Sequence, residues 1–109
     1  MRLKQKDKIL SLIGLAVRAR RCVSGEMMTE NMVKSGRAHL VIAAADASDN
    51  TKKKFRDMCE FYRVPIYIYG DKNTLGHAMG KEFRASLAIL DEGFADGILK
   101  ELKNHEDIA

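Results

Sequence analysis

The chain has 109 residues, of which 46% are hydrophobic and 31% are charged, and its formal net charge is +4. These values suit one compact, folded domain and exclude a disordered chain. Residues 1–85 hold 17 Lys and Arg against 9 Asp and Glu, whereas residues 86–109 hold 2 against 6. The favoured partner is therefore a polyanion, and the alternative is a basic surface that binds nothing.

The first predicted element is a helix over residues 3–20, because apolar residues recur at helical spacing from Ile9 to Ala16. The other face of this helix carries lysines and arginines. A short strand over residues 22–24 follows and leads into the next helix. We therefore expect the chain to open with a basic helix that packs by one face only.

The segment 24–37 holds the first candidate site. Gly25 suits a tight turn from strand to helix, and Gly36 suits the C-terminus of that helix. Acidic residues come early in the helix and basic residues late, in the order that the helix dipole favours. The first backbone amides of such a helix offer a place for a phosphate or another anion.

Continuous apolar residues over 39–45 predict a central strand that is buried on both faces. Residues 46–50 supply a loop and a helix cap. The helix that follows has four residues at core-facing spacing, namely Phe55, Met58, Cys59 and Tyr62.

Lys52, Lys53 and Lys54 open this helix, at the end where the helix dipole disfavours cations. A bound anion would offset that cost. The alternative is three solvated lysines beside Asp49 and Asp57. Both interpretations stay open at the level of sequence.

Val64-Pro65 ends that helix, and the alternating residues 66–69 predict a strand. Tyr67 and Tyr69 share one face of it, where they pack under a helix or, alternatively, stack on bases. Next come a helix over residues 73–79 and an apolar strand over residues 86–90. The last predicted elements are a helix that carries Phe94, Ile98 and Leu102, and a tail over residues 103–109 that frays.

Alternation of helices and strands predicts an α/β fold, a three-layer α/β/α sandwich around a four-stranded sheet. We expect this four-stranded sheet to be mixed. We expect residues 1–109 to form this single domain. In such sheets ligands gather in the loops at one end of the strands. Those loops are residues 24–28, 46–54 and 80–84.

The sequence offers no constellation for catalysis. The histidines His39, His77 and His105 are isolated from one another. Asp46 and Asp49 can ligate a hard metal, but turn and cap roles explain them as well. We therefore expect no enzyme, no metal site and no cofactor.

The glycines of residues 76–82 superficially resemble a phosphate-binding loop. They are one residue too close together, and Lys81 is followed by Glu82 rather than by Ser or Thr. This departure argues against nucleoside triphosphate binding.

Cys22 and Cys59 lie far apart and form no Cys-x-x-Cys pair, which predicts two small buried thiols in a reduced compartment. No apolar run approaches the roughly 18 residues that a membrane span needs, and no signal-peptide pattern opens the chain. We expect a cytoplasmic protein without a membrane partner.

Several motifs together resemble the superfamily of kink-turn RNA-binding ribosomal proteins. They are Val41-Ile-Ala-Ala-Ala-Asp46-Ala-Ser, the Val64-Pro65 pair before an alternating strand, and Leu75-Gly76-x-Ala78-x-Gly80. The bacterial YlxQ branch is similar at Gly14-Leu-Ala-x-Arg18-Ala-Arg20, Val23-Ser-Gly-Glu26, Asp46-Ala-Ser48-x-Asn-Thr51, Gly80-Lys-Glu82 and Gly93-Phe-Ala95. The resemblance covers about residues 8–100.

This resemblance implies an α/β/α sandwich that binds structured RNA without catalysis. The implied RNA surface is made of the turn into the second helix, the loop after the second strand and the loop before the last strand. These are the three loops identified above from pattern and charge.

The chain departs from the strict kink-turn binders after the turn glycine. There the family has an Asn-Glu pair that reads the edges of sheared guanine–adenine pairs, followed by a Lys, and this chain has Met27, Met28 and Asn31. Methionine cannot make those hydrogen bonds. Backbone amides at Gly25 and Glu26 can still hold phosphate or sugar, which positions an RNA without specifying its sequence.

The leading hypothesis is a non-catalytic RNA-binding protein, similar to ribosomal proteins, whose partner is structured RNA, with kink-turn and ribosomal RNA as candidates and no DNA specificity. The candidate RNA-binding residues are Gly25, Glu26, Met27, Met28, Asn31, Arg37, Asp46, Lys52, Lys53, Lys54, Lys81 and Arg84. The alternatives are a protein-interaction adaptor with Met27, Met28 and Met32 as an apolar patch, and an enzyme of unknown type. Of these methionines, Met28 and Met32 are expected to face the core. The residues do not indicate an oligomeric state.

Overall fold

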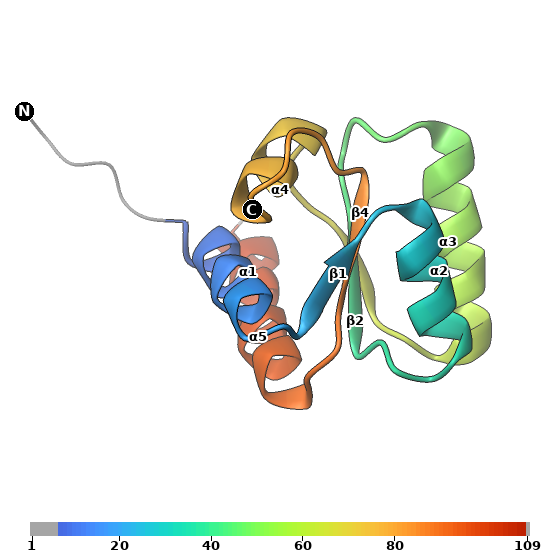
Figure 1. Cartoon of the computed structure of the whole chain (residues 1–109), viewed down its shortest axis with the longest axis horizontal. Coiled ribbons are helices and arrows are strands. Elements are labelled where there is room, and N and C mark those ends of the chain that lie inside the picture. Colours follow the sequence, from blue (N-terminus) through green and yellow to red (C-terminus); the bar gives the residue numbers. More distant parts are fainter. Residues whose placement is uncertain (1–6, 109) are drawn as a thin grey trace, which may run out of the picture.

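The computed structural model describes the backbone of residues 7–108 and the side chains of residues 7–104. Helices and strands alternate along this part of the chain, in the order that the sequence predicts (Figure 1). The elements are α1 (Lys8–Arg18), β1 (Cys22–Ser24), α2 (Glu26–Lys34), β2 (Leu40–Ala43), α3 (Asp49–Tyr62), β3 (Ile66–Ile68), α4 (Lys72–Ala78), β4 (Ser86–Ile89) and α5 (Glu92–Ile108).

The four strands form one mixed sheet in the spatial order β1-β4-β2-β3. Strand β4 runs antiparallel to β1 and to β2, whereas β2 and β3 are parallel. The two central strands have no exposed residue, as expected for strands that are covered on both faces. The predicted four-stranded mixed sheet is therefore confirmed.

Side chains of the central strands alternate between two hydrophobic clusters. Leu40 and Ile42 pack with residues of α1, α4 and α5, whereas Val41 packs with residues of α2 and α3. Figure 1 shows α1, α4 and α5 on one side of the sheet and α2 and α3 on the other. This arrangement confirms the predicted α/β/α sandwich, and Tyr67 and Tyr69 pack against the first cluster as one of their two interpretations predicted.

The prediction that Tyr62 faces the core is wrong, because 40% of its surface is exposed. Helix α3 ends at Tyr62, and Arg63 then adopts a left-handed conformation with φ of 60°. The amide of Val64 donates to the carbonyl of Cys59 at 2.8 Å. This turn carries the side chain of Val64, rather than that of Tyr62, against the second cluster.

Two predictions concern the ends of the chain. The basic residues of segment 1–6 lie outside the described residues, as does Ala109. The backbone is helical through Ile108 and so includes most of the predicted tail. Fraying of residues 103–109 stays a prediction.

Both cysteines are free thiols. Cys59 is fully buried, as predicted, whereas Cys22 is only half-buried and lies with its Sγ 3.5 Å from Sδ of Met79. Burial raises the pKa of Cys22 to about 12 and that of Cys59 to about 11. Neither residue therefore carries an appreciable thiolate at neutral pH.

Over the described residues, none of the helices combines the length and the apolar character that crossing a membrane requires.

Candidate nucleic-acid interface

Three loops meet at one end of the sheet, as the sequence predicted. The amide of Gly25 donates to the carbonyl of Ser86 at 3.0 Å, which joins the turn before α2 to the start of β4. The amide of Ala44, just after β2, donates to the carbonyl of Ala85 at 2.9 Å. Arg84 donates from Nε to the hydroxyl of Ser24 at 2.8 Å. We call this end of the sheet, formed by residues 24–28, 44–54 and 80–86, the loop edge.

The turn at Gly25 has a backbone that only glycine adopts readily, with φ of 96° and ψ of 154°. No side chain caps the helix that follows. Its first internal hydrogen bond runs from the amide of Thr29 to the carbonyl of Gly25, at 3.0 Å. The amides of the three residues between them have no partner within the helix, and they belong to exposed residues.

A buried pair of hydroxyls anchors this turn, and sequence reasoning missed it. Thr29 and Ser86 are fully buried, with their oxygens 3.4 Å apart. They fasten the first turn of α2 to the first residue of β4. The sequence does carry a signal that Thr29 is buried, because it lies four residues before the apolar Val33 on the same helix face.

The prediction that Met28 faces the core is wrong. The buried stripe of α2 runs through Thr29 and Val33, so Met28 lies at its shoulder and is 44% exposed. Met32 packs against the second cluster, as predicted. Met27 is 75% exposed, and Asn31 is exposed on the same helix face.

The three lysines at the start of α3 each have a partner within the protein. Lys52 donates to the carbonyl of Ala45 at 2.8 Å, and Lys53 pairs with Asp57 at 2.7 Å. Lys54 reaches α2 and pairs with Glu26 at 2.9 Å and with Glu30 at 2.8 Å. Intramolecular partners therefore offset part of the unfavourable dipole interaction, and the predicted proximity of Lys53 to Asp57 is confirmed.

Two lysines hold Glu30 strongly ionised. Its carboxylate accepts hydrogen bonds from Lys34 at 2.7 Å and from Lys54 at 2.8 Å. These bonds, first that of Lys34 and then that of Lys54, lower the pKa of Glu30 from 4.5 to about 2. Because the pKa is lower in the folded state, the stabilising contribution of Glu30 is present at neutral pH and is lost as the pH falls from about 4.5 to about 2.

We predict that the Glu30 carboxyl titrates near pH 2, as measured by carbon NMR of the side-chain carboxyl. Lys54→Met should raise this pKa partway toward its ordinary value, because the bond to Lys34 remains. Lys53→Met is the matched control, since Lys53 pairs with Asp57 instead. Titration of Glu30 near pH 4.5 in the unmodified protein would contradict the interaction.

Residues 80–84 are held over α4 by backbone contacts. The amide of Lys81 donates to the carbonyl of Gly76 at 2.7 Å, and the amide of Arg84 donates to that of Lys72 at 3.1 Å. Phe83 between them is 61% exposed. Sequence reasoning did not single out Phe83, because periodicity carries no information within a loop.

Asp46 has a structural role at the start of α4. Its carboxylate accepts a hydrogen bond from the amide of Lys72 at 2.8 Å. The loop after β2 is thereby tied to the same helix that supports residues 80–84. Asp46 thus helps to position two of the three loops, and a contact of its own with RNA stays a prediction.

Arg37 does not lie at the loop edge. It follows α2, whereas Gly25 precedes it, and α2 spans nine residues or about 13 Å. Leu40, at the start of β2, pairs with Ile89 at the end of β4, which is the opposite end of the sheet from Ser86. Only an RNA that extends along α2 would reach Arg37.

The described residues hold no group of three or more metal-ligating side chains. His39 is exposed in the loop before β2, His77 is exposed on α4, and the side chain of His105 lies outside the described residues. Within the described part, every buried polar side-chain atom has a hydrogen-bond partner. The loop edge offers cations, backbone amides and exposed apolar side chains, which are groups suited to contacts with a nucleic acid.

The chain also matches a known protein family over most of its length. Residues 7–98 match the model of the ribosomal protein L7Ae/L30e/S12e/Gadd45 family. The chain belongs to this family.

Proteins from two bacteria and a yeast are similar to this chain in sequence. The chain is 43% identical to RNA-binding protein YlxQ of Bacillus subtilis, covering 84% of the chain and 91% of the relative. It is 38% identical to RNA-binding protein YlxQ of Enterococcus faecium, covering 83% and 86%. It is 30% identical to large ribosomal subunit protein eL30 of Candida albicans, covering 85% and 90%.

Two solved structures extend the similarity. A protein of unknown function from Bacillus halodurans C superposes with a TM-score of 0.87 at 38% identity, over 90% of this chain and 99% of its own. The Giardia lamblia 15.5kD RNA binding protein superposes with a TM-score of 0.76 at 23% identity, over 96% and 93%. The second similarity shows the L7Ae-type fold alone.

Proposed function

We propose that the protein binds structured RNA, without catalysis, through the loop edge. The observation that carries this proposal is the set of hydrogen bonds that join Gly25 to Ser86, Ala44 to Ala85 and Arg84 to Ser24. They gather three loops from distant parts of the chain into one surface. Relatives that are 43% and 38% identical are named RNA-binding proteins, which supports the same partner class.

Cations and backbone amides at this surface are suited to the phosphate backbone of RNA. Lys52, Lys81 and Arg84 lie on two of the three loops, and Lys54 joins α3 to α2. At the turn, Gly25 lets a phosphate or a sugar approach the first amides of α2, because the space beside Gly25 is open and no side chain caps the helix. Such contacts fix the position and the shape of the bound RNA.

The residues that follow the turn favour apolar contact with bases. Met27 and Met28 project from the first turn of α2 with 75% and 44% of their surfaces exposed. Their thioethers provide no donor and only a weak acceptor for a base edge, but they can pack against the face of an unstacked base. Asn31, on the same face, is the amide within reach of a base edge.

We propose kink-turn RNA and ribosomal RNA as the candidate ligands. Relatives of this chain include large ribosomal subunit proteins, and the surface is suited to read shape through backbone contacts. Recognition of a kinked RNA would then depend on its geometry rather than on hydrogen bonds to sheared guanine–adenine pairs. We place this activity in the cytoplasm and expect no DNA specificity.

Fluorescence anisotropy tests the proposal. The protein is titrated with a labelled kink-turn RNA and a straight RNA duplex at two salt concentrations, beside an unrelated protein of similar net charge. We expect tighter, salt-dependent binding to the kinked RNA than to the duplex. Binding to both RNAs no tighter than that of the control protein would contradict the proposal for these ligands.

A second candidate function is a protein-interaction adaptor, and the exposure of Met27 favours it. The apolar patch is smaller than the hypothesis supposed, because Met32 packs against the second cluster and only Met27 and Met28 of the three methionines are exposed. Cross-linking in cells distinguishes the two functions. An adaptor forms a protein cross-link that resists ribonuclease and is lost when both exposed methionines are replaced by glutamine.

A further inference from the structure

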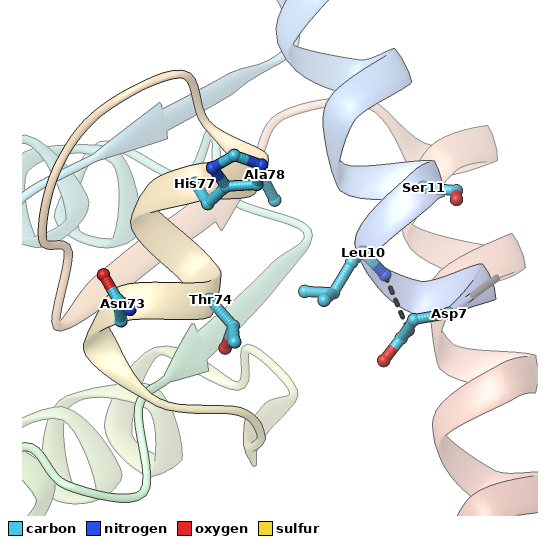
Figure 2. A pocket seen from close by; sticks show the side chains of 7 residues that line it. All are labelled: Asp7, Leu10, Ser11, Asn73, Thr74, His77 and Ala78. Carbon is cyan, nitrogen blue, oxygen red and sulfur yellow. Dashed lines mark hydrogen bonds between the residues drawn. The ribbon is translucent and has the colours of Figure 1, made fainter. Parts of the chain in front are cut away.

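A cavity between α1 and α4 extends the loop edge. It has a volume of about 580 Å³, within the range of small-molecule sites. Figure 2 shows Leu10 pointing from α1 toward α4, with Thr74 and Ala78 on the facing side of α4. Asp7 stands at the start of α1, and His77 lies on the last turn of α4. The cavity thus has apolar walls and a few polar groups.

The α4 wall of the cavity begins at the loop edge, and the α1 wall is connected to the same end of the sheet through Tyr69. Lys72, the first residue of α4, donates its amide to Asp46 and accepts at its carbonyl from the amide of Arg84, at 2.8 and 3.1 Å. On the other wall, the Asp7 carboxylate accepts from the hydroxyl of Tyr69 at 2.6 Å, and the amide of Tyr69 donates to the carbonyl of Ala43 at the end of β2. An RNA on the loop edge therefore needs only a short flank, because α4 is about 10 Å long.

The Asp7 carboxylate determines which group fits. One oxygen accepts from the amide of Leu10 at 2.9 Å and the other from Tyr69. Each carboxylate oxygen has a further acceptor position, so together they can accept two parallel N–H donors. The Watson–Crick edge of guanine offers such a pair at N1 and N2, and its flat faces suit the apolar walls. Adenine and the pyrimidines lack this pair.

Position rather than charge favours a nucleotide over an arginine of a partner protein, which offers a similar pair of donors. Lys8 and Lys72 are next to the cavity in the chain, but so is Asp71, whose carboxylate accepts from the amide of the cavity-lining Thr74 at 2.8 Å. An RNA bound at the neighbouring loop edge brings its own flank within reach of the cavity, whereas a partner protein has to bind independently. We infer that the cavity between α1 and α4 takes an unpaired guanine from a single-stranded flank of the RNA bound at the loop edge.

This inference rests on the proposed function, so its test compares flanks on one folded RNA. Anisotropy titrations compare the kink-turn RNA alone with the same RNA carrying a four-nucleotide single-stranded flank. The flank is placed at the 5′ end or at the 3′ end. It contains one guanine, one inosine or one adenine. We expect the guanine flank at one end to bind roughly tenfold tighter than the adenine flank. Inosine, which lacks the N2 amine, should lie between them.

Two variants locate the effect. Asp7→Asn keeps a residue type that caps helices well, but the new side chain is uncharged and has only one oxygen acceptor. Ala78→Leu fills the cavity with a larger side chain. Both variants should abolish the preference for guanine. Their affinity for the unflanked RNA should change less than twofold, and this retained binding also shows that the variants are folded. Equal binding of guanine and adenine flanks, or a preference that survives both substitutions, would overturn the inference alone. Failure of the unflanked RNA to bind would remove the proposed function as well.

Discussion

Gly76→Ala is expected to destabilise the protein by about 2 kcal/mol or more and to displace residues 80–84. A Cβ at this position would overlap the carbonyl oxygen of Glu82 and lie 2.7 Å from its carbonyl carbon and 2.9 Å from the amide nitrogen of Phe83. The backbone itself must move, and overpacking of this kind typically costs about 1–3 kcal/mol. Urea denaturation measures the change in the free energy of unfolding.

Gly97→Ala is the matched control for this substitution. Gly97 is also within a helix, and the nearest atom to a new Cβ is a methyl carbon of Leu12 at an ordinary 3.8 Å. Alanine should therefore stabilise α5 by about 0.5–1 kcal/mol. Unchanged stability of Gly76→Ala would mean that residues 82 and 83 do not lie over α4.

Replacement of Lys52, Lys53 and Lys54 by glutamine is expected to weaken RNA binding roughly tenfold or more, whatever the sequence of the RNA. A plot of log affinity against log salt concentration should become less steep. By analogy with duplex DNA, we expect its slope on duplex RNA to fall in magnitude by about 0.9 for each phosphate that the variant no longer neutralises. The three lysines are expected to contribute unequally, because Lys53 is engaged with Asp57 and Lys54 with two acids of α2.

Three arginines at the other end of the sheet provide a control with the same change in net charge. Arg18, Arg20 and Arg21 are exposed, and the carbonyl of Arg21 accepts from the amide of Leu90, beyond the end of β4. Replacing them with glutamine should leave the salt slope within experimental error. An equal decrease of the slope in the two triple variants would show that only the overall charge matters.

Periodicity predicted the elements and the layers, because burial in this fold follows regular spacing. The continuous apolar run over β2 and the alternating run over β3 lie where that spacing places them. The same argument failed at helix ends. Tyr62 has core-facing spacing but lies where α3 stops, and Met28 lies beside the stripe that Thr29 occupies.

The candidate site could be predicted at the level of loops rather than of side chains. The tendency of ligands to gather at one end of such sheets pointed to the three loops, and hydrogen bonds at Gly25 and Arg84 agree with this prediction. The partners of Lys54, which lie 24 and 28 residues before it in the chain, depend on how α2 packs against α3. Such long-range contacts have no local signal in the sequence.

The most direct test of the loop edge is amide chemical-shift mapping during titration with kink-turn RNA. The amides of residues 24–28, 44–54 and 80–86 should shift together and saturate at the same RNA concentration. Residues 34–39 and the exposed pair Phe61 and Tyr62 lie outside the loop edge and should change little. The largest shifts at those positions, with the loop edge unaffected, would contradict the proposed RNA surface.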